Sequence, residues 1–100
     1  MIDRYVLSQE ADNDIEAIFA YGETKFGSTQ AISYLIGLNE HFEAIAQNPD
    51  IGKKRNEIKD GLFSFPYNSH IIFYRKMKNR VRIVRVLYGG RDLKNFLTDS

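Results

Sequence analysis

The stretch LFSFPYNSHIIFYRKMKNRVRIVRVLYGG, residues 62–90, contains three strand signals separated by short turns and closed by two glycines. Each of the three runs is rich in branched and aromatic residues, which favour strands, and polar turn residues lie between them. Connections this short join antiparallel neighbours. We predict strands at 62–67, 70–76 and 80–88, with turns around Tyr67–Ser69 and Met77–Asn79.

The last of these strands alternates imperfectly between apolar and charged residues. Strict alternation places Val81, Ile83, Arg85 and Leu87 on one face and Arg82, Val84, Val86 and Tyr88 on the other. Because both faces are mostly apolar, we expect a central strand. An arginine in a half-buried strand is unfavourable unless it is paired or used. Arg82, Arg85 and Arg91 therefore need an explanation, whereas Lys76 and Lys78 at a hairpin tip are expected to be solvated.

Two amphipathic helices are predicted upstream of this stretch. Ser8 can cap a helix over 9–26, and Gly27 ends it. Ser28 can then cap a second helix that runs to about residue 47. The very short connection predicts an antiparallel helical hairpin. A short β-prone run, residues 3–7, precedes the first helix.

The order β-α-α-β-β-β-α predicts a single α+β domain over residues 1–100. We expect two layers, with the N-terminal helical hairpin packed on one face of a mostly antiparallel four-stranded sheet. Asp92 can cap a short C-terminal helix, DLKNFL. The long segment 48–61 is predicted to be a loop, and the sheet face opposite the helices has no obvious cover.

The net charge of +1 conceals a strong split along the chain. Residues 1–50 hold two Lys/Arg and nine Asp/Glu, a net charge of −7, whereas residues 51–100 hold twelve and four, a net charge of +8. Six cations lie within residues 75–85 alone. A nucleic-acid strand, an acidic protein partner and plain solubility are the alternatives that this pattern leaves open, as is an acidic helix layer balancing a basic sheet.

Several classes of protein are unsupported by the composition. There is no cysteine, and two histidines are too few for a histidine-built metal site, so we expect no metal and no cofactor. No apolar run is long enough to span a bilayer, and the first residues lack the features of a signal peptide. We therefore expect a cytoplasmic protein without a membrane partner.

Four segments resemble the ParE branch of the RelE/ParE toxin superfamily. They are LSQEADNDIEAIFAYGETKFG, IAQNPDIGK, FPYNSHIIFYR and RIVRVLYGGRD, in this order along nearly the whole chain. The resemblance implies a RelE/ParE-like fold and a toxin of a type II toxin–antitoxin system. It also implies that ParE-like members poison DNA gyrase, that RelE-like members cut mRNA on the ribosome, and that a cognate antitoxin, ParD for ParE, holds the toxin inactive in a hetero-oligomer.

The sequence favours the gyrase-poison branch. Residues 61–73 contain no Lys, Arg, Asp or Glu, although RelE-like nucleases place cations along the corresponding strands. Ile71 stands where those nucleases carry an arginine, and only Arg91 matches a nuclease-like cation. We therefore expect inhibition by binding, without catalysis. The alternatives are a ribosome-dependent mRNA endoribonuclease and a degenerate relative that only binds an antitoxin.

The predicted target-binding residues are Arg82, Arg85, Tyr88, Arg91 and Asp92. For the nuclease alternative the candidates are Arg91, Tyr88 and His70, although an unperturbed tyrosine, with a pKa of about 10, is a poor general base. Each has a simpler structural role open to it: Arg85 can pair with a helix carboxylate, Tyr88 can finish a strand, and His70 can bond turn backbone. The loop cations Lys53, Lys54 and Arg55 can track a phosphate backbone or be solvated. We expect no sequence-specific contact with nucleic acid.

Overall fold

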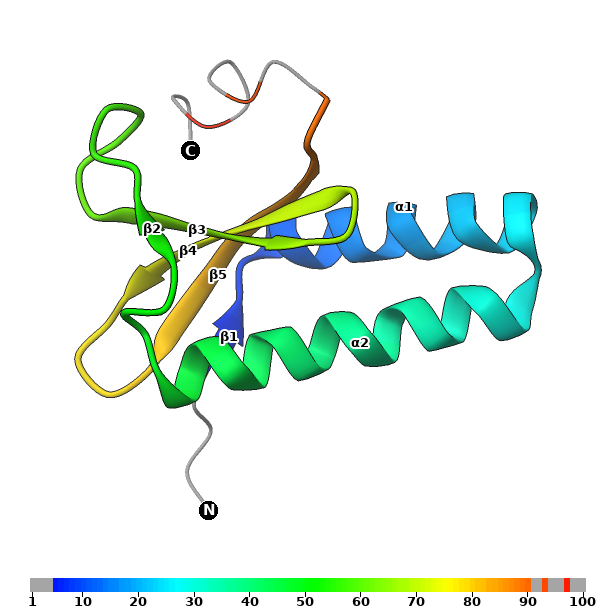
Figure 1. Cartoon of the computed structure of the whole chain (residues 1–100), viewed down its shortest axis with the longest axis horizontal. Coiled ribbons are helices and arrows are strands. Elements are labelled where there is room, and N and C mark those ends of the chain that lie inside the picture. The colour runs from blue at the N-terminus through cyan, green and yellow to red at the C-terminus, as the bar shows by residue number, and fades with distance from the viewer. Residues whose placement is uncertain (1–4, 91–92, 94–96, 98–100) are drawn as a thin grey trace.

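The computed structural model describes residues 5–90 together with Leu93 and Leu97, and it has two layers (Figure 1). One layer consists of α1 (Gln9–Phe26) and α2 (Ser28–Gln47), which Figure 1 shows side by side, with their connection well beyond the sheet. The other is a five-stranded sheet. Its strands are β1 (Tyr5–Leu7), β2 (Lys53–Lys54), β3 (Leu62–Tyr67), β4 (His70–Lys76) and β5 (Val81–Tyr88). The predicted α+β fold with a helical hairpin is confirmed.

The helical hairpin is set by two residues at its ends. Ser8 is the N-cap of α1, and its hydroxyl accepts a hydrogen bond from the Ala11 N–H at 3.0 Å. Gly27 ends α1 with a φ of 90°, a left-handed conformation that side chains disfavour, and its N–H donates to the Glu23 carbonyl. The predicted cap at Ser28 is wrong, because Gly27 occupies the N-cap position of α2 and the Ser28 hydroxyl donates to the Glu23 carboxylate instead.

The sheet has the strand order β1-β5-β4-β3-β2. β1 pairs parallel with β5, and every other pair is antiparallel. The predicted count of four strands is short by one, because Lys53 and Lys54 pair with Ser64 and Phe63 at the edge of the sheet. Two lysines without an apolar pattern give no strand signal. A short lysine-rich edge strand also discourages pairing with another chain.

The main hydrophobic core lies between the helical hairpin and the sheet. Helix residues such as Leu38, Phe42 and Ile45 are at most 4% exposed and pack on the sheet beneath them. The buried sheet residues of this cluster are Phe63, Tyr67, Ile72, Tyr74, Val81, Ile83 and Val86. The two layers are therefore joined by one continuous apolar interface, which fixes the orientation of the strands under α1 and α2.

The opposite face of the sheet is covered, contrary to expectation. Leu62, Phe73 and Leu87 form a second buried cluster with Leu97, which is 1% exposed. Ile58, Ile71 and Leu93 pack against this cluster. The cover comes from the loop before β3 and from positions near the C-terminus, which short-range periodicity does not connect with the sheet. Apart from Leu93 and Leu97, the predicted helix at residues 92–97 lies outside the described residues.

A β-bulge interrupts the pairing of β4 with β5. Tyr74 pairs with Ile83 and Phe73 pairs with Arg85, so Val84 has no partner in this register. The extra residue reverses the alternation along the rest of β5. Val86 therefore joins Val81 and Ile83 in the core under the helices, and Leu87 joins the opposite cluster. The predicted assignment of β5 residues to the two faces is wrong beyond Ile83 for this reason.

Candidate functional site

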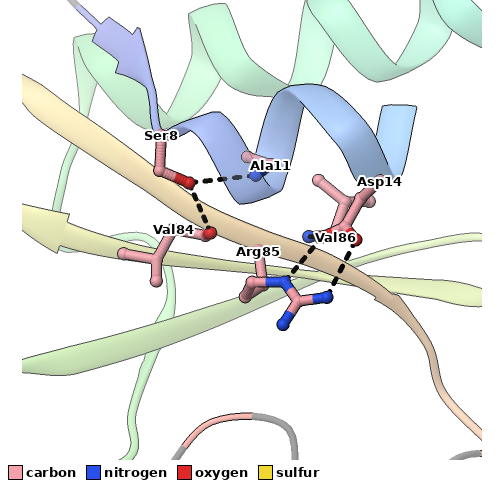
Figure 2. Close-up of polar contacts among 6 residues, drawn as sticks. All are labelled: Ser8, Ala11, Asp14, Val84, Arg85 and Val86. Atoms are coloured by element: carbon pink, nitrogen blue, oxygen red, sulfur yellow. Dashed lines mark hydrogen bonds and ion pairs between the residues drawn. The ribbon is translucent and has the colours of Figure 1, made fainter. Parts of the chain in front are cut away.

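The start of α1 supplies the hydrogen bonds that the bulged backbone requires (Figure 2). The Ser8 N–H donates to the Ile83 carbonyl at 3.0 Å, and the Ser8 hydroxyl donates to the Val84 carbonyl at 2.7 Å. The Asp14 carboxylate accepts the Val86 N–H at 2.9 Å. Because a buried backbone group without a partner is unfavourable, these contacts make the bulge compatible with a buried position.

Arg85 belongs to the same assembly. Its Nε and Nη2 donate to the two carboxylate oxygens of Asp14 at 2.8 and 2.9 Å, and each of the two side chains is 14% exposed (Figure 2). The hydrogen bonds from Arg85 to Asp14 raise the pKa of Arg85 above its ordinary value, against the opposing effect of burial. Arg85 thus makes the contact with a helix carboxylate that was the alternative to target binding. A bidentate pair of this kind fixes β5 against α1.

Arg82 has different surroundings, although it is only three positions away. It is exposed and lies directly opposite Arg75 in the pairing of β4 with β5. Arg75 in turn pairs with Leu62, and the Arg55 N–H donates to the Leu62 carbonyl at 2.7 Å. Three cations therefore lie in one row across four strand positions. We call Arg55, Arg75 and Arg82 the basic row.

The basic row borders a small pocket on the sheet face opposite the helices. The pocket has a volume of about 130 Å³, and its floor is apolar. Its lining residues are Ser8, Glu10, Lys59, Leu62, Arg75, Arg82, Val84 and Leu97. Among these described residues, Lys59, Arg75 and Arg82 are the cations and Glu10 is the carboxylate. The arrangement can accept an anion, because guanidinium groups donate several hydrogen bonds in one plane.

Neither Arg75 nor Arg82 forms an ion pair within the described residues. The Arg75 Nη1 instead donates to the Asp60 carbonyl at 2.7 Å, which orients its guanidinium without neutralising it. Arg55 is partly engaged, since it donates to the Ser64 hydroxyl at 2.8 Å and pairs with Glu57 at 3.4 Å. The uncompensated charge of the row is therefore concentrated at Arg75 and Arg82.

Lys76 contrasts with the basic row. It pairs with Asp50, and its ammonium group lies 5.2 Å from the centre of the Phe63 ring. The salt bridge to Lys76 lowers the pKa of Asp50 below its ordinary value. Lys76 is exposed, as expected, and the loop after α2 also brings a carboxylate to it at the hairpin tip.

The remaining described candidates, His70 and Tyr88, pair with each other at the far end of β4 and β5. Their ring centres are 6.1 Å apart, and Tyr88 is 53% exposed. The Tyr34 hydroxyl lies 2.6 Å from Nδ1 of His70. Burial raises the pKa of Tyr34, so its hydroxyl stays protonated at neutral pH and shares a hydrogen bond with that nitrogen. His70 is thereby oriented by α2.

Arg91 and Asp92, two of the predicted target-binding residues, lie outside the described residues. Among the residues that the structure does describe, no group of three or more His, Cys, Asp or Glu is placed to hold a metal ion. None of the described helices is both long and apolar enough to cross a bilayer.

Sequence reasoning did not single out Arg75 or Lys59. Arg75 was visible as part of the cation cluster at residues 75–85, but its alignment with Arg82 depends on the strand register. Lys59 reaches the pocket from a loop. A register inferred from the turn between β4 and β5 could have found the Arg75–Arg82 pair, whereas no local signal indicates Lys59.

Comparison with known proteins agrees with this architecture. The family model described as "ParE toxin of type II toxin-antitoxin system, parDE" matches residues 5–93. A protein named Toxin ParE1 from Caulobacter vibrioides is 36% identical over 93 residues, covering 93% of this chain and 96% of that protein. A Toxin ParE1 from Mycobacterium tuberculosis is 34% identical over 94 residues, with coverage of 93% and 96%.

Among solved structures, one titled "Chromosomal ParDE TA system from P. aeruginosa" matches the fold with a TM-score of 0.75. The match covers 85% of this chain and 94% of that one at 16% sequence identity, and so speaks for the fold alone. The family model and the relatives carry the assignment. The chain belongs to the ParE toxin family of type II toxin–antitoxin systems.

Proposed function

We propose that this toxin inhibits DNA gyrase by binding to it, without catalysis of its own. The observation that carries the proposal, beyond family membership, is the role of residues 61–73. This segment has no charged residue, and five of its side chains are buried in the two cores: Leu62, Phe63, Tyr67, Ile72 and Phe73. It builds the interior of the sheet, where a metal-free ribonuclease would need exposed cations and proton carriers.

The distance of His70 and Tyr88 from the basic row also argues against a nuclease that uses this row. His70 and Tyr88 lie at one end of the β4–β5 pair, whereas Arg75 and Arg82 lie at the other. His70 and Arg75 are five positions apart, and five residues along a strand span about 17 Å. A general acid or base must lie within hydrogen-bonding reach of the atoms it serves. His70 and Tyr88 therefore cannot act on a phosphate held by Arg75 and Arg82.

The target is tested with purified toxin in two parallel assays. In a gyrase supercoiling assay, we expect the toxin to block supercoiling or to trap cleaved DNA. In a ribosome translation assay read by primer extension, we expect the message to stay intact. Ribosome-dependent cuts in the message, with gyrase unaffected, would overturn the proposal and favour the endoribonuclease alternative.

The partner that we propose is a ParD-like antitoxin with a net acidic, amphipathic segment. The support is the charge split of the chain and the large apolar side chains that the helical hairpin exposes. They are Tyr21, Phe26, Ile32 and Ile36, each at least 50% exposed. A segment that covers these apolar side chains and extends to the basic second half of the chain would bury apolar area and neutralise cations. We place this complex in the cytoplasm, together with gyrase.

Co-expression of the antitoxin should restore growth of cells that carry the toxin. The complex should melt at a higher temperature than the free toxin, because a ligand that binds only the folded state stabilises it. Its affinity should fall with rising salt. Tight binding through an uncharged segment, with no dependence on salt, would contradict the electrostatic part.

A further inference from the structure

We propose that the basic row, together with Lys59, binds phosphodiester groups of a nucleic-acid backbone without reading its sequence. The inference goes beyond the proposed function, because a phosphate site is a property of this chain whether or not gyrase is its target. It rests on the strand register, on charges that have no ion pair among the described residues, and on the pocket between them.

Two like charges lie opposite each other in the basic row. Arg75 and Arg82 are direct cross-strand partners, an arrangement that destabilises a sheet. No described carboxylate forms an ion pair with either, although Glu10 lines the same pocket. Counted over the lining residues that the structure describes, Lys59, Arg75 and Arg82 against Glu10 leave an excess of two positive charges. A bound oxyanion would relieve this repulsion, and the forked guanidinium groups suit phosphate oxygens.

The basic row is longer than the pocket. Neighbouring strands lie about 4.8 Å apart, so the three strand spacings from Arg55 to Arg82 cover about 14 Å. The pocket itself, at about 130 Å³, has room for one phosphate-sized group. Lys53 pairs with Ser64 and extends the cations along the edge strand. A row longer than its pocket fits a polymer of phosphates better than a single small anion.

The described residues that line the pocket offer neither an exposed apolar anchor nor a ring for stacking. None of the described large apolar side chains that are exposed lines the pocket, and the floor residues Leu62 and Leu97 are 1% exposed. A docked peptide needs an apolar anchor, and the exposed apolar residues that the structure describes lie elsewhere. Among the described residues, no aromatic ring lines the pocket as a platform for bases either. Binding through phosphates alone is therefore independent of sequence.

The test uses the full-length toxin and a fluorescein-labelled 12-base-pair DNA duplex, with binding measured by anisotropy between 50 and 200 mM salt. Contact with three phosphates predicts a slope of log K against log salt of about −2.7, or roughly a 40-fold loss of affinity over this range. Arg82→Gln and Lys59→Gln should each reduce the slope by about 0.9. A second duplex of unrelated sequence should bind equally well.

The matched controls are Lys76→Gln and Lys25→Gln, which remove cations away from the pocket and should leave binding unchanged. Melting curves of all variants establish that each is folded. Equal DNA binding by wild type, Arg82→Gln and Lys59→Gln would overturn the proposal. So would a glutamate-rich peptide that competes as well as DNA at equal charge, since the row would then suit an acidic protein segment.

The result is separable from the proposed function. Loss of DNA binding in both row variants, with wild-type toxin inactive on gyrase, would retain the phosphate site and remove gyrase as the target. Inhibition of gyrase by wild type and by both row variants, with no DNA binding by any of them, would remove the phosphate site alone.

Discussion

Arg82 and Arg85 lie three positions apart on β5, yet the structure gives them opposite surroundings. Arg85 is bound by both oxygens of Asp14 and is 14% exposed, whereas Arg82 is exposed and faces another arginine. Val84, the residue between them that lacks a partner in the register, separates the two environments. Residue type and strand position therefore do not define the role of an arginine on β5. The hydrogen bonds between α1 and the bulge determine which arginine is buried against the helix.

The largest effect on stability is expected when Arg85 loses its partner. Asp14→Ala removes the partner of a buried guanidinium and the acceptor for the Val86 N–H. Loss of one member of a buried pair lowers the free energy of unfolding by about 3–5 kcal/mol. Urea denaturation of the purified protein measures it. Asp14→Asn keeps an acceptor and should lose less; a loss under about 1 kcal/mol for Asp14→Ala would show that the pair is not structural.

A smaller loss is expected at Ser8, which holds the bulge from its other side. Ser8→Ala removes the N-cap of α1 and leaves the Val84 carbonyl without its donor. We expect the free energy of unfolding to fall by about 1–3 kcal/mol. Ser8→Thr, which keeps a hydroxyl, is the matched control and should recover most of it. Equal losses in both variants would assign the effect to packing and not to these hydrogen bonds.

Tyr74 lies on β4 beside the bulge and makes the stability of the fold depend on pH. Its hydroxyl donates to the Pro49 carbonyl at 2.7 Å, and burial raises its pKa. A raised pKa in the folded state means that stability is complete below the unfolded pKa of about 10 and is lost as pH rises above it. The difference in melting temperature between wild type and Tyr74→Phe should therefore shrink as pH rises above about 10. A constant difference would exclude this linkage.

The smallest effect on stability is expected at Arg82. Its side chain is exposed and has no ion pair among the described residues, so Arg82→Gln should change the free energy of unfolding by no more than about 0.5 kcal/mol. Because the substitution removes the repulsion between Arg82 and Arg75, the free energy of unfolding can even rise slightly. Urea denaturation beside Asp14→Ala gives the contrast directly. A loss as large as that of Asp14→Ala would remove the distinction between the two arginines.

Local chemistry made much of the fold predictable. Ser8 and Gly27 mark the ends of α1 as expected, and the two turns within residues 62–90 join antiparallel neighbours. These features depend on residues close together in the chain. The α+β architecture follows from their order, since a helical hairpin and a half-apolar sheet bury their apolar faces against each other.

The features that were missed depend on contacts between distant residues. The bulge at Val84 is stabilised by Ser8, 76 positions earlier, so alternation within β5 could not reveal it. The cover on the second sheet face comes from Leu97 and the loop residue Ile58. The alignment of Arg75 with Arg82 requires the register of two strands. The candidate site was therefore only partly predictable: Arg82 from its unfavourable position in a strand, but not its neighbours.

The role of Arg82 is tested most directly by gyrase supercoiling with folded wild-type, Arg82→Gln and Lys76→Gln proteins at matched concentrations. We predict that Arg82→Gln melts at the same temperature as wild type but has lost most of its inhibition, while Lys76→Gln still inhibits. Full inhibition by folded Arg82→Gln would contradict it, because the exposed arginine of β5 would then have no part in the toxin's action.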